Sequence, residues 1–450
     1  MKKFFIILFI GSLISFIGIW QIVNKGYDRQ NKVILAIKKI IPSHLARKVK
    51  ETIFFIPNLM EKNRVLSLQV KKFEQGLNGE LFKEQTLKTD KDTKFAVKEF
   101  FLPFPRLDLR LGWAGAENSK RAHYLEIIDD KILVISGLGQ TIYFDKKNIN
   151  SKKLNQKAVT NNIKEYLDSN KFELIGIRDL FYDDGYVYIS LQHKDRNGFT
   201  INIYRSEYNL KHLEFKPFFV INEYWDKYNV FSGGRLEKFE GNRILFSIGF
   251  SKNYYAPQDK KSFLGKIISI DKITKNHELI SYGHRNPQGL FFSDNKKIII
   301  NTEHGPFGGD ELNINFLENN SQEKNFGWPI SSTGKPYPGE EKIFEKENWL
   351  SKTHEENGFI EPIRSFSPAI GISEVIYLER KNTDLFYVAS LRAGSIYILK
   401  PDKDFKKIDS EERLFFKEQR IRDLKYDKDL DLFFAIFSYT PSISIIKYLD

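Results

Sequence analysis

One pattern recurs six times between about residue 120 and the end of the chain. Each copy has an apolar strand start, a charged turn and a second strand rich in β-branched and aromatic residues. Subtracting the numbers of successive starts gives intervals of 55, 56, 54, 85 and 49 residues, so one interval is enlarged. The starts are at Leu125, Leu180, Leu236, Leu290, Val375 and Leu424.

Repeats of this size, each with three or four strands, are typical of β-propeller blades. Such sheets have two apolar faces and bury both by packing radially around a channel. A β-sandwich would have turns at about eight to twelve residues without a larger repeating unit. We therefore predict an all-β, six-bladed β-propeller over residues 120–450. Propellers bind ligands at one mouth of the channel, so the enlarged interval is where we expect a site.

The residues before the propeller predict a membrane attachment. Residues 4–23 form an apolar run after two lysines, long enough to span a bilayer and without a small-x-small cleavage site. We expect a transmembrane anchor or an uncleaved signal there. Residues 24–64 have helical apolar spacing among basic residues, which predicts a juxtamembrane helical stalk, either lying on anionic headgroups or solvated. Residues 65–119 remain a poorly defined lead-in.

Composition excludes several classes of protein. Aromatic residues make up 14% of the chain, which excludes intrinsic disorder. There is no cysteine, which excludes a disulfide scaffold, a cysteine-ligated zinc site and a thiol nucleophile. The net charge is +12, from 70 basic and 58 acidic side chains. These charges are spread along the chain, and the sequence has no recognisable nucleic-acid-binding motif, so we expect no nucleic-acid partner.

The enlarged interval begins with three loops rich in glycine, proline and polar side chains. Oxygen-rich turns of this kind suit a hard cation such as calcium, which prefers carboxylates and backbone carbonyls. Each loop alone is weak evidence, because such segments are often plain turns. The loops are Gly283-His284-Arg285-Asn286-Pro287-Gln288-Gly289-Leu290, Glu303-His304-Gly305-Pro306-Phe307-Gly308-Gly309-Asp310-Glu311-Leu312-Asn313 and Asn325-Phe326-Gly327-Trp328-Pro329.

Together, in this order, the loops resemble the glucose/sorbosone dehydrogenase family, which includes the soluble quinoprotein aldose sugar dehydrogenases. The resemblance covers about residues 170–450. It implies a six-bladed propeller with pyrroloquinoline quinone (PQQ) over the channel mouth and calcium on the quinone. Further matching segments are Ser232-Gly233-Gly234-Arg235-Leu236, Pro257-Gln258-Asp259, Ser367-Pro368-Ala369, Ser390-Leu391-Arg392 and Arg420-Ile421-Arg422-Asp423.

For the cofactor, the resemblance implies a set of basic and polar contacts. Arg285 and Asn286 would contact the reactive carbonyl side of the quinone, and Tyr337 matches a cofactor-contacting tyrosine. Arg420 and Arg422 match a pair that binds cofactor carboxylates. Guanidinium groups suit a tricarboxylate because they pair with carboxylates in a bidentate way. Arg392 stands where some family members have lysine.

For the metal, the resemblance implies two calcium sites. The backbone carbonyls of Gly305 and Pro306 would hold the calcium on the quinone, where it would polarise the carbonyl that accepts hydride. Glu311 and the carbonyl of Phe326 match a second, structural calcium site.

The family pattern breaks at its general base. The family has a histidine four residues before the Arg of its Gly-Arg-Leu strand start, and that position is Phe231 here. A phenyl ring cannot accept a proton, and a positioned base contributes about 10²- to 10⁴-fold. A cofactor-contacting glutamine of the family's Gly-Gln-Gly-Gly loop is also missing from the matching stretch Leu174-Ile175-Gly176-Ile177-Arg178-Asp179.

The resemblance and its breaks imply two alternative functions. The first is a membrane-anchored, PQQ-dependent aldose sugar dehydrogenase-like oxidoreductase on the extracytoplasmic, periplasmic side, acting on a sugar or other alcohol. Another group, Asp226, Tyr228 or His304, would then serve as base, or the ligand would differ. The second is a non-catalytic propeller that binds a sugar, peptide or envelope partner and retains calcium. The sequence leaves open whether the protein is an enzyme.

Overall fold

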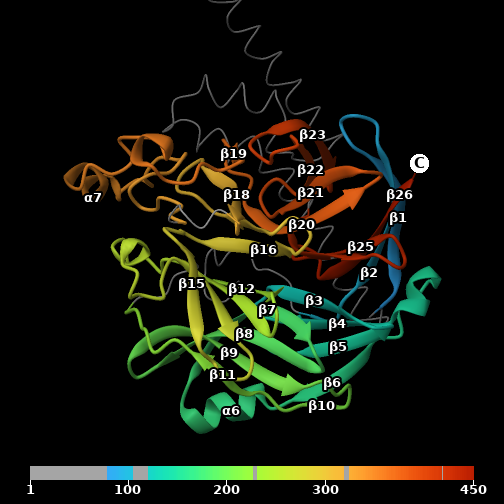
Figure 1. Cartoon of the computed structure of the whole chain (residues 1–450). Helices are drawn as coiled ribbons and strands as arrows, with labels where there is room; N and C mark the ends of the chain where they lie inside the picture. Colours follow the sequence, from blue (N-terminus) through green and yellow to red (C-terminus); the bar gives the residue numbers. More distant parts are fainter. Residues whose placement is uncertain (1–78, 105–119, 227–230, 319–323, 418, 450) are drawn as a thin grey trace, which may run out of the picture.

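The computed structural model describes residues 79–104, 120–226, 231–318, 324–417 and 419–449. Within these residues the chain forms six sheets of four or five strands. Figure 1 shows the sheets arranged around a centre, with β3, β7, β12 and β16 near it and β11, β15 and β23 toward the periphery. The predicted all-β, six-bladed propeller is confirmed.

Each blade is an antiparallel sheet whose strands follow one another from the channel outward, apart from one added strand in the first blade and two in the last. The first blade has β3 (His123–Ile128), β4 (Lys131–Ser136), β5 (Thr141–Asp145) and β6 (Lys157–Asn161), with β10 (His212–Leu213) parallel to β6. The second has β7 (Glu173–Asp183), β8 (Tyr186–Asp195), β9 (Gly198–Glu207) and β11 (Lys216–Val220). The third has β12 (Gly233–Phe239), β13 (Arg243–Ile248), β14 (Lys266–Asp271) and β15 (His277–Tyr282).

The remaining three blades continue around the ring. The fourth has β16 (Pro287–Ser293), β17 (Ile298–Glu303), β18 (Asp310–Phe316) and β19 (Arg364–Phe366). The fifth has β20 (Ile372–Arg380), β21 (Thr383–Ser390), β22 (Ser395–Pro401) and β23 (Ile408–Phe415). The sixth has β24 (Ile421–Asp427), β25 (Leu432–Phe437) and β26 (Ser442–Leu449), then β2 (Lys94–Phe101) and β1 (Leu81–Lys88).

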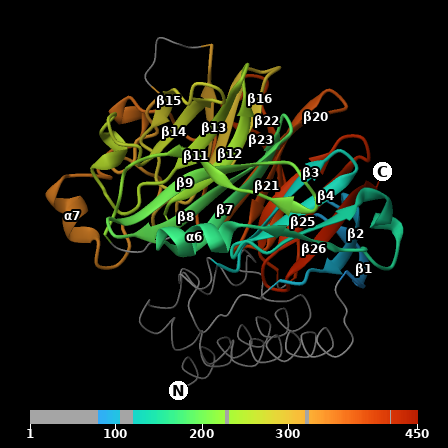
Figure 2. The same ribbon diagram turned by 90° about the horizontal axis from the view of Figure 1, so that it is seen from below.

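The hydrophobic core lies between neighbouring blades. All six residues of β25 and all six of β17 are buried, because each strand has a blade on both faces. One apolar cluster joins Leu133 of the first blade to Ile189 and Leu191 of the second. Ile163 and Leu167 of α6 (Ile163–Asn170) belong to the same cluster, and Figure 2 shows α6 beside the strands of these blades. Radial packing of apolar strands therefore supplies the main stabilisation.

The sixth blade is closed by strands from the opposite part of the sequence. β2 pairs antiparallel with β26, from Lys94↔Leu449 to Phe101↔Ser442, and β1 pairs with β2. The sequence assigned residues 65–119 to a lead-in and began the propeller at residue 120. This boundary is corrected, because β1 and β2 lie within that range and complete the sheet. Their partner strand is at the far end of the chain, so no local pattern could reveal the pairing.

The enlarged interval extends the fourth blade outward. After β18 the chain runs through α7 (Glu341–Lys346), which projects at the edge of the molecule in Figure 1. The chain then returns as β19, which pairs with β18 from Asp310↔Phe366 to Leu312↔Arg364.

The predicted anchor over 4–23 and stalk over 24–64 lie outside the described residues. Among the residues that the structure does describe, no helix is long and apolar enough to cross a bilayer.

Candidate functional site

Six inner strands line the channel, and each contacts the next, so that β3, β7, β12, β16, β20 and β24 close a ring. Five of them carry a register irregularity just before the repeated Leu or Val. Bulges of this kind redirect side chains and are common beside binding sites. The irregularities fall at Ile177/Asp179, Gly233/Leu236, Pro287/Gly289, Ile372/Val375 and Ile421/Asp423.

The middle of the channel holds a compensated charge cluster around Arg235. Its Nη1 lies 2.8 Å from Asp179, 3.0 Å from Glu374 and 2.9 Å from Asp423. Asp179 also accepts the backbone N–H of Leu236 in the next blade at 2.7 Å. Burial opposes the charged form of Arg235, but the three carboxylates outweigh it and hold its pKa well above the usual value. Arg235 therefore joins blades, and its charge is already satisfied.

Arg285 is a buried cation at the start of the fourth blade, and only 3% of its surface is exposed. Its backbone N–H donates to Glu303 at 2.7 Å, and its Nη1 donates to the carbonyl of His304 at 2.7 Å. Its guanidinium has no carboxylate partner among the described residues, and Nε there has no hydrogen-bond partner. Burial lowers the pKa of Arg285. A buried, uncompensated guanidinium favours an anionic or carbonyl-bearing ligand.

Four aromatic rings surround the guanidinium of Arg285. Its Cζ lies 4.7 Å from the ring centroid of Phe231, 5.0 Å from Trp328, 5.5 Å from Phe250 and 5.6 Å from Tyr337. Phe231 also packs on Phe250, with ring centroids 5.3 Å apart. The residue at the family's base position is thus part of an apolar cage that offers Arg285 cation–π contacts.

Asn286 ties the third and fourth blades together. Its Oδ1 accepts from the backbone N–H of Gly233 at 3.3 Å and from Nε2 of Gln288 at 3.2 Å. Its carbonyl accepts the N–H of His304 at 3.1 Å. The Arg285–Asn286 pair is therefore fixed from several sides.

The predicted calcium loop after β17 is tightly folded. A Cβ on Gly305 would lie 1.5 Å from the carbonyl oxygen of Gly309, so only glycine fits. The carbonyl of Pro306 accepts from the N–H of Gly309 at 3.2 Å and keeps one lone pair. The rings of Phe307 and Tyr337 meet with centroids 6.2 Å apart, which brings Tyr337 to this loop.

Three side chains were alternatives for the missing base. Asp226 is exposed, and Tyr228 lies outside the described residues. The imidazole Nδ1 of His304 lies 3.5 Å from Asp310, while the carbonyl of His304 accepts from Arg285. Of these three candidates, His304 is the one that the structure shows in contact with Arg285.

Glu303 and Glu311 are register partners on β17 and β18, and both are buried. Burial opposes ionisation of Glu303, but the neighbouring imidazole of His284, 3.3 Å away, outweighs it and lowers the pKa of Glu303. Burial and the charge of Glu303 raise the pKa of Glu311 to about 8. The carboxyl groups of Glu303 and Glu311 are adjacent and have one neighbouring imidazole, that of His284. A bound cation would supply the positive charge needed for both carboxyl groups to be ionised.

The carbonyl of Phe326, the other predicted ligand of the second calcium, accepts from Nε2 of His354 at 3.2 Å. In the described part of the chain, no group of three or more His, Cys, Asp or Glu side chains could hold a metal ion. A calcium site here would therefore need backbone carbonyls beside Glu311.

The other predicted cofactor arginines lie between β21 and β22 of the fifth blade and at the start of β24 in the sixth. Nη1 of Arg422 donates to Oε1 of Gln288 at 3.0 Å, so Arg422 reaches the Asn286 network. Arg420 precedes β24, and its carbonyl accepts from the N–H of Ser438 at 2.9 Å. Arg392 is exposed beside Gly371. The structure thus links Arg285, Asn286 and Arg422 and leaves Arg392 on the surface.

The sequence reasoning assigned no role to two residues, Arg178 and Gln192. Arg178 is buried on β7 and donates from Nε to Oε1 of Gln192 at 3.0 Å, and Ser232 also donates to that oxygen. A signal was available in the repeat, because Arg178 precedes Leu180 by two residues just as Arg422 precedes Leu424.

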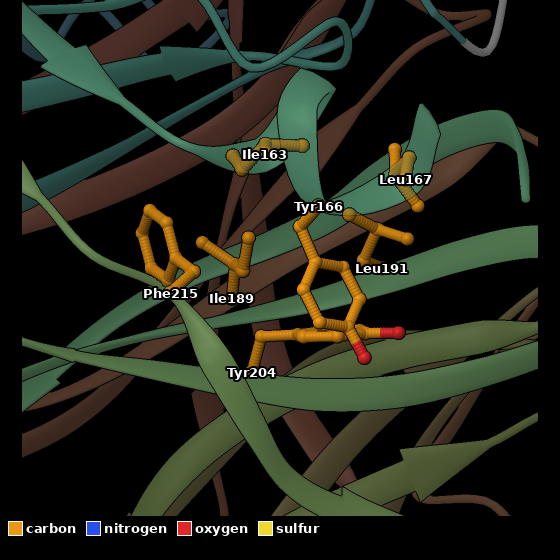
Figure 3. A pocket seen from close by; sticks show the side chains of 7 residues that line it. All are labelled: Ile163, Tyr166, Leu167, Ile189, Leu191, Tyr204 and Phe215. Carbon is orange, nitrogen blue, oxygen red and sulfur yellow. The ribbon is translucent and has the colours of Figure 1, made fainter. Parts of the chain in front are cut away.

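A separate pocket lies between α6 and the second blade (Figure 3). Its lining is apolar apart from the hydroxyl groups of Tyr166 and Tyr204, and no charged side chain lines it, so we do not assign chemistry there. The lining residues are Ile163, Tyr166, Leu167, Ile189, Leu191, Tyr204 and Phe215.

The chain is similar to known sequences over much of the propeller. The family model described as glucose / sorbosone dehydrogenase matches residues 173–440, more than half of the chain. An uncharacterised protein of Synechocystis is 26% identical over 283 residues, which are 57% of this chain and 65% of the relative. The aldose sugar dehydrogenase of Escherichia coli is 29% identical over 220 residues, 44% of this chain and 54% of that protein. The chain thus matches less than two thirds of either relative.

Solved structures show the same architecture. A glucose dehydrogenase has a TM-score of 0.60 at 19% identity, covering 74% of this chain and 98% of that one. The PQQ-bound form of the aldose sugar dehydrogenase from Streptomyces coelicolor has a TM-score of 0.53 at 19% identity, covering 78% and 98%. At these identities the likeness establishes the fold.

Proposed function

The chain belongs to the glucose/sorbosone dehydrogenase family, and from that membership we propose that it is an aldose sugar dehydrogenase-like oxidoreductase that binds PQQ at the channel mouth. Its substrate would be a sugar or another alcohol. Support comes from the name of the Escherichia coli relative and from the quinone-bound Streptomyces coelicolor structure.

The observation that carries the proposal is the uncompensated guanidinium of Arg285. Its Nε has no hydrogen-bond partner among the described residues, although the group is buried. Nε of Arg422 is likewise unpaired there. Buried donors of this kind normally have acceptors, so a ligand rich in carbonyl and carboxylate oxygens fits both positions.

When bound, the quinone would accept hydride from the hydroxyl-bearing carbon of the substrate. The chain's own residues would orient the ligand and remove the hydroxyl proton. Arg285 would donate to a ligand oxygen while Glu303 and His304 hold its backbone and its Nη1. With Phe231 at the usual base position, His304 is our candidate proton acceptor, because Asp310 lies 3.5 Å from its Nδ1 and can orient the ring.

We further propose that calcium supports this site. The carbonyls of Gly305 and Pro306 would face the calcium that accompanies the cofactor. Glu311 and the carbonyl of Phe326 would hold a second ion, which fits the shortage of positive charge beside Glu303 and Glu311.

Titration with PQQ and calcium, followed by aldose-dependent dye reduction, tests the proposal. We expect micromolar binding of PQQ, with turnover that falls when Arg285 is replaced by methionine. Failure to bind PQQ at micromolar concentration in the presence of calcium would overturn it.

A second function is favoured by one observation, the packing of Phe231 on Arg285. An apolar ring where the family has a base is what a non-catalytic propeller would have if it only binds a sugar, peptide or envelope partner. In that case PQQ or calcium would bind without aldose oxidation, and His304→Ala would leave the binding unchanged.

We also propose that residues 4–23 anchor the protein with its propeller on the extracytoplasmic side. The chain has no cysteine, so a single Ile273→Cys, at a position 79% exposed, gives a clean reporter. A membrane-impermeant maleimide should label it in spheroplasts of a Gram-negative host. Labelling only after lysis would contradict the proposed side.

A further inference from the structure

Arg178 and Arg422 occupy the same level of the channel. Each lies two residues before the repeated leucine of its inner strand, on β7 and β24. These strands are separated in the ring by β3, which contacts both. Each residue lies within a register irregularity of its strand, and irregularities of this kind redirect side chains.

Both guanidinium groups are held by neutral glutamine oxygens. Arg178 donates from Nε to Oε1 of Gln192 at 3.0 Å, and its Nη2 also donates to that oxygen. Arg422 donates from Nη1 to Oε1 of Gln288 at 3.0 Å. Glutamine fixes a guanidinium without neutralising it, so each residue keeps a full positive charge.

Arg235, in the same channel, differs from Arg178 and Arg422 in its ion pairs. It has three carboxylates within 3.0 Å, whereas neither Arg178 nor Arg422 has an ion pair among the described residues. Arg178 is 9% exposed. Burial, and then the charges of Arg235 and Arg178, lower the pKa of Arg422, and they outweigh the opposing effects of Tyr124 and Asp423. Arg422 is half-buried. Two like charges held in the channel without an ion pair are unfavourable until an anion joins them.

The two arginines belong to one hydrogen-bonded chain. Gln288 donates to Oδ1 of Asn286 at 3.2 Å, which also accepts from the N–H of Gly233 at 3.3 Å. The preceding residue, Ser232, donates to Oε1 of Gln192 at 3.3 Å. Gly234 leaves room for the arginine stem, since a Cβ there would lie 2.4 Å from Cβ of Arg178. The site is therefore built and held before a ligand arrives.

We infer that Arg178 and Arg422 together form a carboxylate-binding site, in which Arg178 is a specificity-determining contact for an anionic ligand in the channel. The inference deepens the proposed function, because it assigns a second carboxylate contact to the ligand of that site. Neither guanidinium reacts; both position the ligand through charge-assisted hydrogen bonds.

Two probes separate this inference from the proposed function. The first is PQQ, and the second is trimesate, a planar, redox-inert benzenetricarboxylate. Binding of each is measured calorimetrically with wild type, with Arg178→Met and with Arg196→Met, whose arginine is exposed at the turn between β8 and β9 of the same blade.

We expect Arg178→Met to weaken trimesate binding at least tenfold and Arg196→Met to leave it unchanged. A second variant, Gln192→Glu, keeps Arg178 in place but gives it an internal carboxylate, and it should weaken trimesate binding to a similar extent. Rising salt should weaken wild-type binding and have less effect on either channel variant.

Trimesate affinity that is unchanged in both Arg178→Met and Gln192→Glu would overturn the inference, as would no trimesate binding to wild type at about 1 mM, the weak end of measurable affinity. If trimesate binding depends on Arg178 but PQQ does not bind, the carboxylate site stands and the quinone proposal falls. If PQQ binds equally well to wild type and Arg178→Met, the quinone proposal stands and Arg178 is not a contact for the quinone.

Discussion

The guanidinium carbon of Arg285 lies 4.7 Å from the centre of the Phe231 ring. This contact places a phenyl group directly against the candidate cofactor arginine, at the position where the family has its base. The ring protects the buried cation from water and cannot take a proton. Binding and chemistry at this site can therefore be tested separately.

Replacing Phe231 with histidine tests whether the pocket is otherwise competent. We expect aldose-dependent dye reduction with PQQ and calcium to rise by about 10²-fold or more, because a positioned base contributes that much. Phe231→Leu, which keeps an apolar side chain, is the matched control and should gain nothing. Equal activity in the two variants would show that loss of the base does not limit the reaction.

Substituting methionine for Arg285 and for Arg235 should have different effects on stability and on PQQ binding. Arg285→Met should lower PQQ affinity at least tenfold, through loss of a charged hydrogen bond, while the melting temperature stays the same or rises. Arg235→Met leaves three buried carboxylates without their cation and should cost about 3–5 kcal/mol of unfolding free energy. Denaturant titration and PQQ binding measure both effects. Equal destabilisation by the two substitutions would contradict the view that only Arg235 is compensated.

Glu311→Gln should remove calcium binding without destabilising the calcium-free protein. The carboxyl group of Glu311 is buried beside Glu303, so an amide should be tolerated without calcium. Calcium-dependent stabilisation should disappear, since a binding ion stabilises only where its ligand is present. Melting curves with and without calcium give the answer. If calcium still raises the melting temperature of Glu311→Gln, the calcium site does not include Glu311.

His193 should make the protein sensitive to acid. Its ring is 2% exposed and stacks on Phe172, and burial lowers its pKa to about 4. Between the unfolded value near 6.5 and the folded value, the unfolded chain binds more protons, so stability falls as pH falls through this window. The shift corresponds to at most about 3 kcal/mol.

His193→Gln should flatten this part of the stability profile, measured by urea unfolding at several pH values. His212→Gln, at an exposed histidine, serves as the control and should leave the slope in place. An unchanged slope in His193→Gln would assign the acid sensitivity to other groups.

Phe95→Ala tests the closure of the sixth blade. The Phe95 side chain is 1% exposed and meets the ring of Tyr448 with centroids 5.4 Å apart. Its loss should cost about 3–5 kcal/mol in a urea titration. Lys94→Ala, at the exposed neighbour on the same strand, should change stability by less than about 0.5 kcal/mol. Similar values for both would argue against a packed β2–β26 pair.

The repeat made the blades predictable, since the six apolar starts each fall within an inner strand, from Leu125 in β3 to Leu424 in β24. What the repeat could not reveal depended on distant partners. β2 pairs with residues at the other end of the sequence, and the charge of Arg235 is balanced by Asp179, Glu374 and Asp423 from three other blades. Within the site, Arg285 and Phe231 were both singled out, but their contact needs two blades to be placed side by side.

The pairing of β2 with β26 also sets an order of events during synthesis. Lys94 leaves the ribosome well before its register partner Leu449, which lies 355 residues later in the sequence. At about 5–20 residues per second, the wait is on the order of tens of seconds. Through that time β2 presents an unpaired edge, a ready template for another nascent chain. The seam that closes the finished ring is thus where a growing chain would most need a chaperone.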